Sequence, residues 1–355
     1  MAGPTPAWSS SPTGCWAAAA LSCKGCRPTA TPCSRPNRTS PKPSATSAAA
    51  TNCPKLDFTA GQIQAPEEQL QEERHMANVL VTGCSSGFGM LTARQFARKG
   101  DSVLATMRDT RKAGALEKAR DAEKLDNIKV LQLDVLDDAS VKKAVTEASK
   151  AAPIDVLVNN AGLELKSPIE DATDDEVKRQ FDTNVLGALR VIRAVLPAMR
   201  KRGAGTIINV SSIAGIVAPP YGGFYAASKQ ALEAISEALH YEVRPLGVRI
   251  IVVEPGGFAT EFRNNIQAAA AFNESSLYWE RAERFETAMR GITVPGGKRG
   301  DPEDVAIAIY NAVHDPEPKL RYLVGNDAKM IADVRKRLDF ESFEKAMRQT
   351  MNWQD

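Results

Sequence analysis

The chain has 355 residues, of which 43% are hydrophobic and 25% are charged, and its formal net charge at pH 7 is +2. This length suits one large α/β domain or two average domains, and the near-neutral charge gives no electrostatic reason to expect a nucleic acid or an anionic membrane as partner. Because no apolar run approaches the roughly 18 residues of a membrane-spanning helix, we expect a protein without a membrane span.

The first 75 residues differ in composition from the rest of the chain. They are rich in Pro, Ser, Thr and Ala, and no acidic residue occurs before Asp57. Such a segment buries too little apolar surface to offset its ordering entropy, which indicates disorder, while its basic, acid-poor composition resembles an organelle transit peptide. A third interpretation is a start codon assigned too early, because Met76 directly precedes the first strand signal. We therefore expect a disordered or targeting-like tail over residues 1–75 and the folded domain over residues 76–355.

The cysteines and histidines give no sign of a disulfide framework or a metal site. Only Cys84 lies outside the tail, so the main body is typical of a reduced, intracellular protein, and we expect a cytoplasmic location unless the tail directs the chain to an organelle. Cys23 and Cys26 have metal-ligand spacing but no second ligand pair nearby. The three histidines, His75, His240 and His314, are scattered and match no ligand spacing, so we expect no metal.

From residue 77 onward, short aliphatic strand signals alternate with longer helical stretches such as 140–152 and 176–202. Near-continuous apolar strands that alternate with helices predict a parallel sheet covered on both faces. The fold class is therefore α/β, a single-domain Rossmann-type doubly wound sheet of about seven strands, with ligands at the carboxyl ends of the strands. The predicted strands are 78–82, 102–106, 128–133, 154–159, 206–211, 248–254 and 321–325.

A glycine-rich turn follows the first predicted strand, in "TGCSSGFG" at 82–89. Gly83, Gly87 and Gly89 would let backbone amides approach a pyrophosphate at the N-terminus of the next helix, whose dipole favours negative charge. The strand before the turn and the helical "MLTARQFARKG" after it are the context expected of a dinucleotide site.

The end of the second strand, "ATMRD", bears on the choice of dinucleotide. NAD sites usually carry an acidic residue there, whereas this chain has Met107 followed by Arg108, and an arginine can pair with a 2′-phosphate. Asp109, one position later, is a competing signal. We favour NADP(H) over NAD(H).

Tyr225 and Lys229, in "YAASK", lie four positions apart in a predicted helix. Residues at i and i+4 share one helix face, about 6 Å apart. An ammonium group that close favours the phenolate, which would make Tyr225 a proton donor and acceptor near neutral pH.

The order and spacing of these and further motifs resemble the short-chain dehydrogenases/reductases (SDR family), over about residues 77–325. The glycine spacing of Gly83, Gly87 and Gly89 is similar to theirs, and "NNAG" follows the fourth strand at 159–162. Ser212 lies thirteen residues before Tyr225, Asn184 matches the helix asparagine of the family, and "PGG" at 255–257 follows the sixth strand.

The resemblance implies an NAD(P)(H)-dependent oxidoreductase that interconverts a carbonyl and a secondary alcohol. Tyr225 would be the general acid/base, and Lys229 would hold the nicotinamide ribose and lower the pKa of Tyr225. Ser212 rather than Ser211 would bind the substrate oxygen, because neighbouring strand residues face opposite sides. Asn184 would hold a water that links Lys229 to solvent. The implied cofactor-binding residues are Gly83, Ser85, Ser86, Gly87, Phe88, Gly89, Arg108, Asp134, Val135, Asn160, Ala161, Gly162, Tyr225, Lys229, Pro255, Gly256 and Thr260.

A substrate lid is expected over about residues 258–300, where apolar residues recur at helical spacing. We expect roughly half of them to pack the lid onto the sheet and the rest to favour a hydrophobic steroid-, retinoid- or ketone-like substrate. The apolar residues are Phe258, Phe262, Phe272, Leu277, Tyr278, Trp279, Phe285 and Met289.

Two other functions share this fold, a dinucleotide-binding regulator and a nucleotide-sugar epimerase or dehydratase. Regulators typically lack the Tyr–Lys pair. Epimerases have a different glycine spacing and a larger C-terminal domain, whereas the roughly 30 residues after "RYLVG" predict one amphipathic helix. The resemblance also implies a dimer or tetramer.

Overall fold

The computed structural model describes residues 76–291 and 300–353. The predicted N-terminal tail and the last part of the predicted lid, residues 292–299, lie outside the described residues. In the described part of the chain, no helix combines the length and apolar character needed to cross a membrane.

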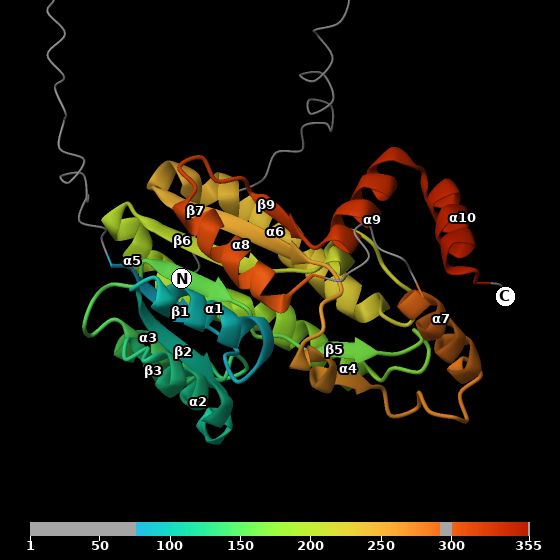
Figure 1. Cartoon of the computed structure of the whole chain (residues 1–355), viewed down its shortest axis with the longest axis horizontal. Coiled ribbons are helices and arrows are strands. Elements are labelled where there is room, and N and C mark those ends of the chain that lie inside the picture. Colours follow the sequence, from blue (N-terminus) through green and yellow to red (C-terminus); the bar gives the residue numbers. More distant parts are fainter. Residues whose placement is uncertain (1–75, 292–299, 354–355) are drawn as a thin grey trace, which may run out of the picture. The chain divides into compact units, whose positions relative to one another are not determined.

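The core of the domain is one seven-stranded sheet in which every neighbouring pair is parallel, as the sequence predicts (Figure 1). The strand order is β3-β2-β1-β4-β6-β7-β9, so the chain reverses its direction of growth between β1 and β4. Ligand sites of such sheets lie at that switch point, beyond the carboxyl ends of the strands. The strands are β1 (Asn78–Val81), β2 (Ser102–Met107), β3 (Ile128–Gln132), β4 (Val156–Asn159), β6 (Gly205–Val210), β7 (Val248–Pro255) and β9 (Arg321–Val324).

Alternation along the strands divides the core into two layers. Val79 and Val81 of β1 belong to one apolar cluster, which also contains Phe96 from α1 and Ile309 from α8, whereas Leu80 belongs to the opposite cluster with residues of α3 and α5. Both faces of the sheet are therefore covered, and α1 and α8 lie side by side on one of them (Figure 1). The helices around the sheet are α1 (Gly87–Arg98), α2 (Gly114–Glu123), α3 (Asp138–Ala148), α4 (Asp174–Phe181), α5 (Ala188–Arg202), α6 (Gly223–Val243) and α8 (Pro302–His314).

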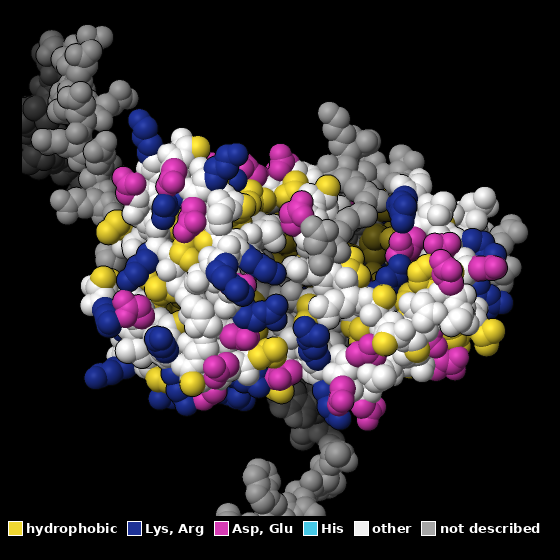
Figure 2. Space-filling model, turned by 90° about the horizontal axis from the view of Figure 1, so that it is seen from below, with side chains coloured by type: hydrophobic (Ala, Val, Ile, Leu, Met, Phe, Trp, Pro, Cys, Tyr) yellow, Lys and Arg dark blue, Asp and Glu magenta, His cyan; other side chains and the backbone are white. Residues whose placement is uncertain are grey.

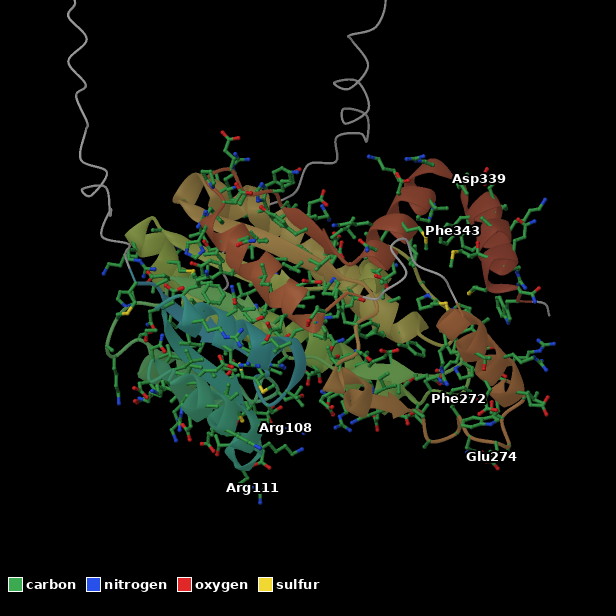
Figure 3. The ribbon with its side chains drawn as sticks, viewed as in Figure 1. Arg108, Arg111, Phe272, Glu274, Asp339 and Phe343 are labelled. Carbon is green, nitrogen blue, oxygen red and sulfur yellow. The ribbon has the colours of Figure 1, made fainter. Side chains whose placement is uncertain are left out.

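Two helix predictions need correction. The predicted helix over 176–202 is interrupted by a π-helical turn, Asp182–Gly187, between α4 and α5. The single amphipathic helix predicted at the C-terminus is wrong, because the segment forms α9 (Asn326–Arg337) and α10 (Phe340–Met351). The break falls where the Asp339 carboxylate accepts a hydrogen bond from the Ser342 amide at 2.9 Å and caps a new helix, seen with Phe343 in Figure 3.

The predicted lid contains a short strand and a helix. β8 (Ile266–Ala268) pairs in parallel with β5 (Glu164–Lys166), and α7 (Trp279–Gly291) follows. Phe258, Phe272 and Phe285 are buried, whereas Leu277 is 90% exposed. Part of the apolar set therefore packs the lid, as expected; Phe272 lies in the segment leading to α7 (Figure 3).

Charged side chains of both signs are interspersed on the face of the molecule shown in Figure 2.

Candidate active site

The glycine-rich turn after β1 adopts a backbone that requires glycine. Gly83 and Gly87 have φ angles of +73° and +57°, in the left-handed region. A Cβ on Gly89 would lie 2.4 Å from the Gly83 carbonyl oxygen and 2.5 Å from Nδ2 of Asn160, so any side chain there would force the loops apart. The turn therefore brings bare backbone to the start of α1.

The N-terminus of α1 is suited to an anion. Ser86 is its N-cap residue, yet its side chain makes no capping hydrogen bond, and the first turn contains no acidic residue. The first amides of a helix lack internal partners, and the helix dipole places partial positive charge there. A phosphate could therefore be bound at this end of α1.

Asn160 and Thr82 join the glycine turn to the loop after β4. Nδ2 of Asn160 donates to the carbonyl oxygens of Thr82 at 2.9 Å and Gly83 at 3.2 Å. The Thr82 hydroxyl oxygen in turn accepts from the amides of Asn160 at 3.0 Å and Ala161 at 3.1 Å. Two segments far apart in the sequence thus form one rigid floor.

Above this floor lies a cleft of about 360 Å³, called here the dinucleotide cleft. A larger hollow of about 780 Å³ involves α7 and α10 and contains none of the predicted site residues. The predicted residues that line the dinucleotide cleft are Gly83, Ser85, Ser86, Gly87, Phe88, Arg108, Asp134, Val135, Asn160, Ala161 and Gly162. Residues of the lining that the sequence analysis did not select include Lys112, Leu163, Arg179, Thr183, Phe262, Asn265 and Gln267.

Charge at the end of β2 is arranged around Arg108, which is exposed and lines the dinucleotide cleft. Asp109, the competing signal, is held by its neighbour: Nε and Nη2 of Arg111 both donate to its carboxylate at 2.9 Å, and the Arg111 amide donates at 3.1 Å. Figure 3 shows Arg108 and Arg111 at this end of the molecule. Lys112 adds a further positive charge to the cleft.

Three of the four predicted catalytic residues meet at the start of α6. The Tyr225 hydroxyl hydrogen-bonds with Ser212, and the Tyr225 ring centroid lies 5.6 Å from Nζ of Lys229. Lys229 is 6% exposed, and its Nζ donates to the Val210 carbonyl oxygen at 2.8 Å. The ring of Phe262, which lines the dinucleotide cleft, is centred 6.1 Å from that of Tyr225, so the cleft and the catalytic group adjoin.

The electrostatics of this group differ from the expectation. Burial, reinforced by the nearby Glu164 carboxylate, raises the pKa of Tyr225 above its ordinary value of 10, and the Ser212 hydrogen bond only partly opposes this. Burial also lowers the pKa of Lys229 to about 8, while Glu233 and Glu164 act in the opposite direction. The expected lowering of the Tyr225 pKa by Lys229 is therefore not found in the chain without ligands.

The two serines at the end of β6 are divided as expected. Ser212 faces Tyr225, whereas the Ser211 hydroxyl is turned away and donates to Glu233 at 2.6 Å inside the protein. The Ser212 oxygen also accepts from the Ala214 amide at 3.1 Å, which fixes its orientation.

Asn184 lies in the π-helical turn and is 2% exposed. Its side chain accepts from the Leu163 amide and donates to the Leu163 carbonyl oxygen, both at 2.9 Å, and donates to Oγ of Ser228 at 3.1 Å. A π-turn shifts the side-chain register of a helix and often occurs at functional sites. Here it lets one asparagine connect the loop after β4 to α6, next to Lys229.

The loop after β7 also reaches the site. Thr260 faces the glycine turn, because a Cβ on Gly87 would lie 3.9 Å from its Cβ. Pro255 ends β7, and Gly256 lies against Asp327 of α9, whose Oδ1 would be 2.1 Å from a Cβ on Gly256. These residues are thus at the rim of the site and are held from the C-terminal side.

Glu164 is the titratable residue of this site that the sequence analysis missed. It follows "NNAG" at the carboxyl end of β4, and that position was a signal that could have identified it. The structure describes no group of three or more His, Cys, Asp or Glu side chains within residues 76–291 and 300–353 that could hold a metal ion.

Known proteins share both the sequence pattern and the fold. The model of the family described as short chain dehydrogenase matches residues 77–271. A 3-ketodihydrosphingosine reductase of Bacteroides thetaiotaomicron is 36% identical over 70% of this chain and 87% of its own length. Human retinol dehydrogenase 8 is 37% identical over 68% of this chain and 79% of its own length. A structure of serine dehydrogenase complexed with NADP⁺ has 30% identity and a TM-score of 0.57, over 70% of this chain and 94% of that one.

Proposed function

Because the chain belongs to the short-chain dehydrogenase family and is an NAD(P)-dependent oxidoreductase, we propose that it reduces a hydrophobic ketone, or oxidises the corresponding secondary alcohol, with NADP(H) preferred over NAD(H). The observation that carries the proposal is the meeting of Ser212, Tyr225 and Lys229 beside the dinucleotide cleft.

The chain's own groups fit a dinucleotide. The uncapped start of α1 and the bare glycine turn would hold the pyrophosphate, and the cations Arg108 and Lys112 would face a 2′-phosphate. Asp109 is engaged by Arg111, which reduces its ability to bind ribose hydroxyls as the acidic residue of an NAD site does. The NADP⁺ in the serine dehydrogenase structure is in line with this preference.

In the proposed reduction, a bound nicotinamide supplies a hydride to the carbonyl carbon. Tyr225, whose raised pKa keeps it protonated at neutral pH, donates a proton to the carbonyl oxygen. Ser212 holds that oxygen in position and stabilises the negative charge that develops on it. Lys229 orients the cofactor from the same helix face, and Asn184 secures the loop and helix between which the cofactor lies.

The proposal of a hydrophobic substrate rests on the aromatic residues around Tyr225. Phe262 comes within 6.1 Å of its ring, and Phe272 stacks on Tyr221 with centroids 6.0 Å apart. Pockets lined by apolar and aromatic side chains with a few convergent polar groups are typical of small-molecule sites. The names of the two relatives, a reductase of 3-ketodihydrosphingosine and a dehydrogenase of retinol, agree with this class.

The test combines cofactor binding with turnover. NADPH and NADH are titrated by fluorescence, and ketones and secondary alcohols are then screened through the absorbance of NADPH. We expect NADPH to bind more tightly than NADH, and Tyr225→Phe to lower kcat at least about 100-fold while NADPH binding changes less than about twofold, because proton transfer alone is removed.

Tyr241→Phe is the matched control, since it makes the same chemical change on the same helix at a side chain that is 71% exposed. It should retain full activity. Failure to bind either cofactor, or full activity in Tyr225→Phe, would refute the proposed function.

A further inference from the structure

Glu164 occupies a fixed position directly after the loop that ends β4. The amide of Leu163 donates to Oδ1 of Asn184 at 2.9 Å, and the amide of Leu165 donates to Oε1 of Gln180 at 2.6 Å, so the backbone is held on both sides of Glu164. Leu165 is 3% exposed and belongs to the apolar cluster that contains Phe272. Because neighbouring strand residues face opposite sides, Glu164 points away from that cluster.

The same hydrogen bonds bring this strand against the catalytic helix. Both Asn184 and Gln180 donate to Oγ of Ser228, at 3.1 and 3.4 Å, and Ser228 directly precedes Lys229. The Glu164 carboxylate accordingly raises the pKa of both Tyr225 and Lys229, which requires it to be near both groups. A half-buried carboxylate thus stands beside the atoms proposed to transfer the proton.

Other charges near the site leave this role to Glu164. Lys166, on the same side of β5, forms an ion pair with Glu286 of α7, so its charge is directed to the lid. The other acidic neighbour of Lys229, Glu233, is 6% exposed and binds Ser211 and Arg321 behind the site. The carboxylate that a substrate meets beside Tyr225 is therefore that of Glu164.

We propose that Glu164 determines substrate specificity by binding a protonated amine carried on the carbon next to the reacting carbonyl or carbinol carbon. The inference rests on the proposed function and deepens it. A carboxylate repels carboxylate and phosphate substituents, and its charge-assisted hydrogen bond to an ammonium is roughly twice as strong as a neutral one. The predicted substrate is an amphiphile, with the amine near Glu164 and the hydrophobic part against the aromatic residues of the lid.

The amine takes no part in the redox step. In the direction of oxidation, R–CH(OH)–CH₂–NH₃⁺ loses a hydride from its carbinol carbon to NADP⁺ and the hydroxyl proton to Tyr225. The products are R–CO–CH₂–NH₃⁺, NADPH and a proton, which Tyr225 passes on to solvent.

The experiment compares two alcohols that differ only in this group. One is H₃N⁺–CH₂–CH(OH)–R with a hexyl chain as R, and the other carries a methyl group in place of the ammonium. Rates of NADP⁺ reduction by the full chain are measured near about pH 7.5. We expect wild-type kcat/KM to favour the amino alcohol at least about tenfold, and Glu164→Gln to reduce this ratio to within about threefold.

Glu164→Asp, which keeps the charge, should restore part of the preference, and a merely structural role of the side chain would not produce this order. Glu170→Gln, an equivalent change at an exposed position on the same segment, should keep the wild-type ratio. Equal kcat/KM for the two alcohols in the wild type, or an unchanged ratio in Glu164→Gln, would overturn the inference while leaving the oxidoreductase intact. Absence of turnover of both alcohols together with absence of NADPH binding would overturn the proposed function as well.

Discussion

Cofactor choice is proposed to depend on one guanidinium group, that of Arg108 at the end of β2. Arg108→Ala should raise the Kd of NADPH about 10- to 100-fold, because a hydrogen bond to a charged group contributes about 1.5–3 kcal/mol. The Kd of NADH should change less than about threefold, since NADH lacks the 2′-phosphate. Fluorescence titration of both cofactors measures this difference.

Arg120→Ala is the appropriate control, because Arg120 lies on α2 next to its partner Asp121 and is not part of the dinucleotide-cleft lining. It should leave both Kd values unchanged. If Arg108→Ala weakened NADPH and NADH equally, Arg108 would act on the shared part of the cofactor and the proposed preference would lose its basis.

At the scale of residues, the sequence predicted what local spacing determines. The glycine turn and the Tyr225–Lys229 pair depend on neighbours a few positions away, and the structure places both at one end of the sheet. The pKa directions could not be predicted, because they depend on burial and on Glu164, which is distant in sequence from Tyr225. The i, i+4 argument considered the ammonium alone and so gave the wrong direction for Tyr225.

At the scale of elements, α9 secures the loop that follows β7. Oδ2 of Asp327 accepts from the Gly257 amide at 2.6 Å, and the Gly256 amide donates to the Val324 carbonyl oxygen at 2.9 Å. Asp327→Ala should release this loop, which is proposed to lie beside the nicotinamide. We expect KM for NADPH to rise about 5- to 10-fold, as loss of about 1–1.4 kcal/mol of hydrogen bonding implies, and kcat to change less than about twofold.

Asp333→Ala tests whether this effect is specific. Asp333 lies on the same helix and pairs only with Arg337 among the contacts described for its side chain, at the surface. It should leave KM unchanged, and Asp327→Asn, which retains an acceptor oxygen, should fall between the wild type and Asp327→Ala. An unchanged KM in Asp327→Ala would mean that the loop keeps its position without α9.

Element boundaries were harder to predict than element types. All seven sheet strands were placed, because their apolar runs are buried on both faces of the sheet. The π-turn at Asp182–Gly187 and the break before Asp339 were missed. Both keep the apolar period of a helix nearly intact, and only side-chain hydrogen bonds, such as those of Asn184 and Asp339, define them.

At the scale of the whole molecule, stability should depend on the protonation of Glu254. This residue of β7 is 1% exposed, its Oε1 makes no hydrogen bond, and Nε of Arg321 lies 3.7 Å away. Burial, together with the neighbouring Glu233 carboxyl, raises the pKa of Glu254 from 4.5 to about 8. The folded chain therefore binds this proton more tightly than the unfolded chain, and the resulting stability is complete below about pH 4.5 and lost as the pH rises through about 8.

Glu254→Gln removes this titration. Between about pH 6 and about pH 9, the free energy of unfolding of the variant should gain at least about 1 kcal/mol relative to wild type, or about 2–4 °C in Tm. Thermal unfolding across this range measures the difference. Glu237→Gln is the control, because Glu237 binds the same Arg321 at 2.8 Å but its side chain is 48% exposed. Melting temperatures of Glu254→Gln and wild type that run parallel from pH 6 to 9 would contradict the prediction.

The central place of β1 in the sheet has a consequence for synthesis of the chain. β1 is made first of the seven strands, yet one of its two neighbours is β4, and the Asn78 amide meets its partner Asp155 only 77 positions later. While the ribosome makes the intervening residues, one edge of an entirely apolar strand has no native partner. The glycine turn meanwhile lacks Asn160, which later locks it. The nascent chain must therefore pass through a stage in which its most aggregation-prone edge and its unfinished cofactor site are the same place.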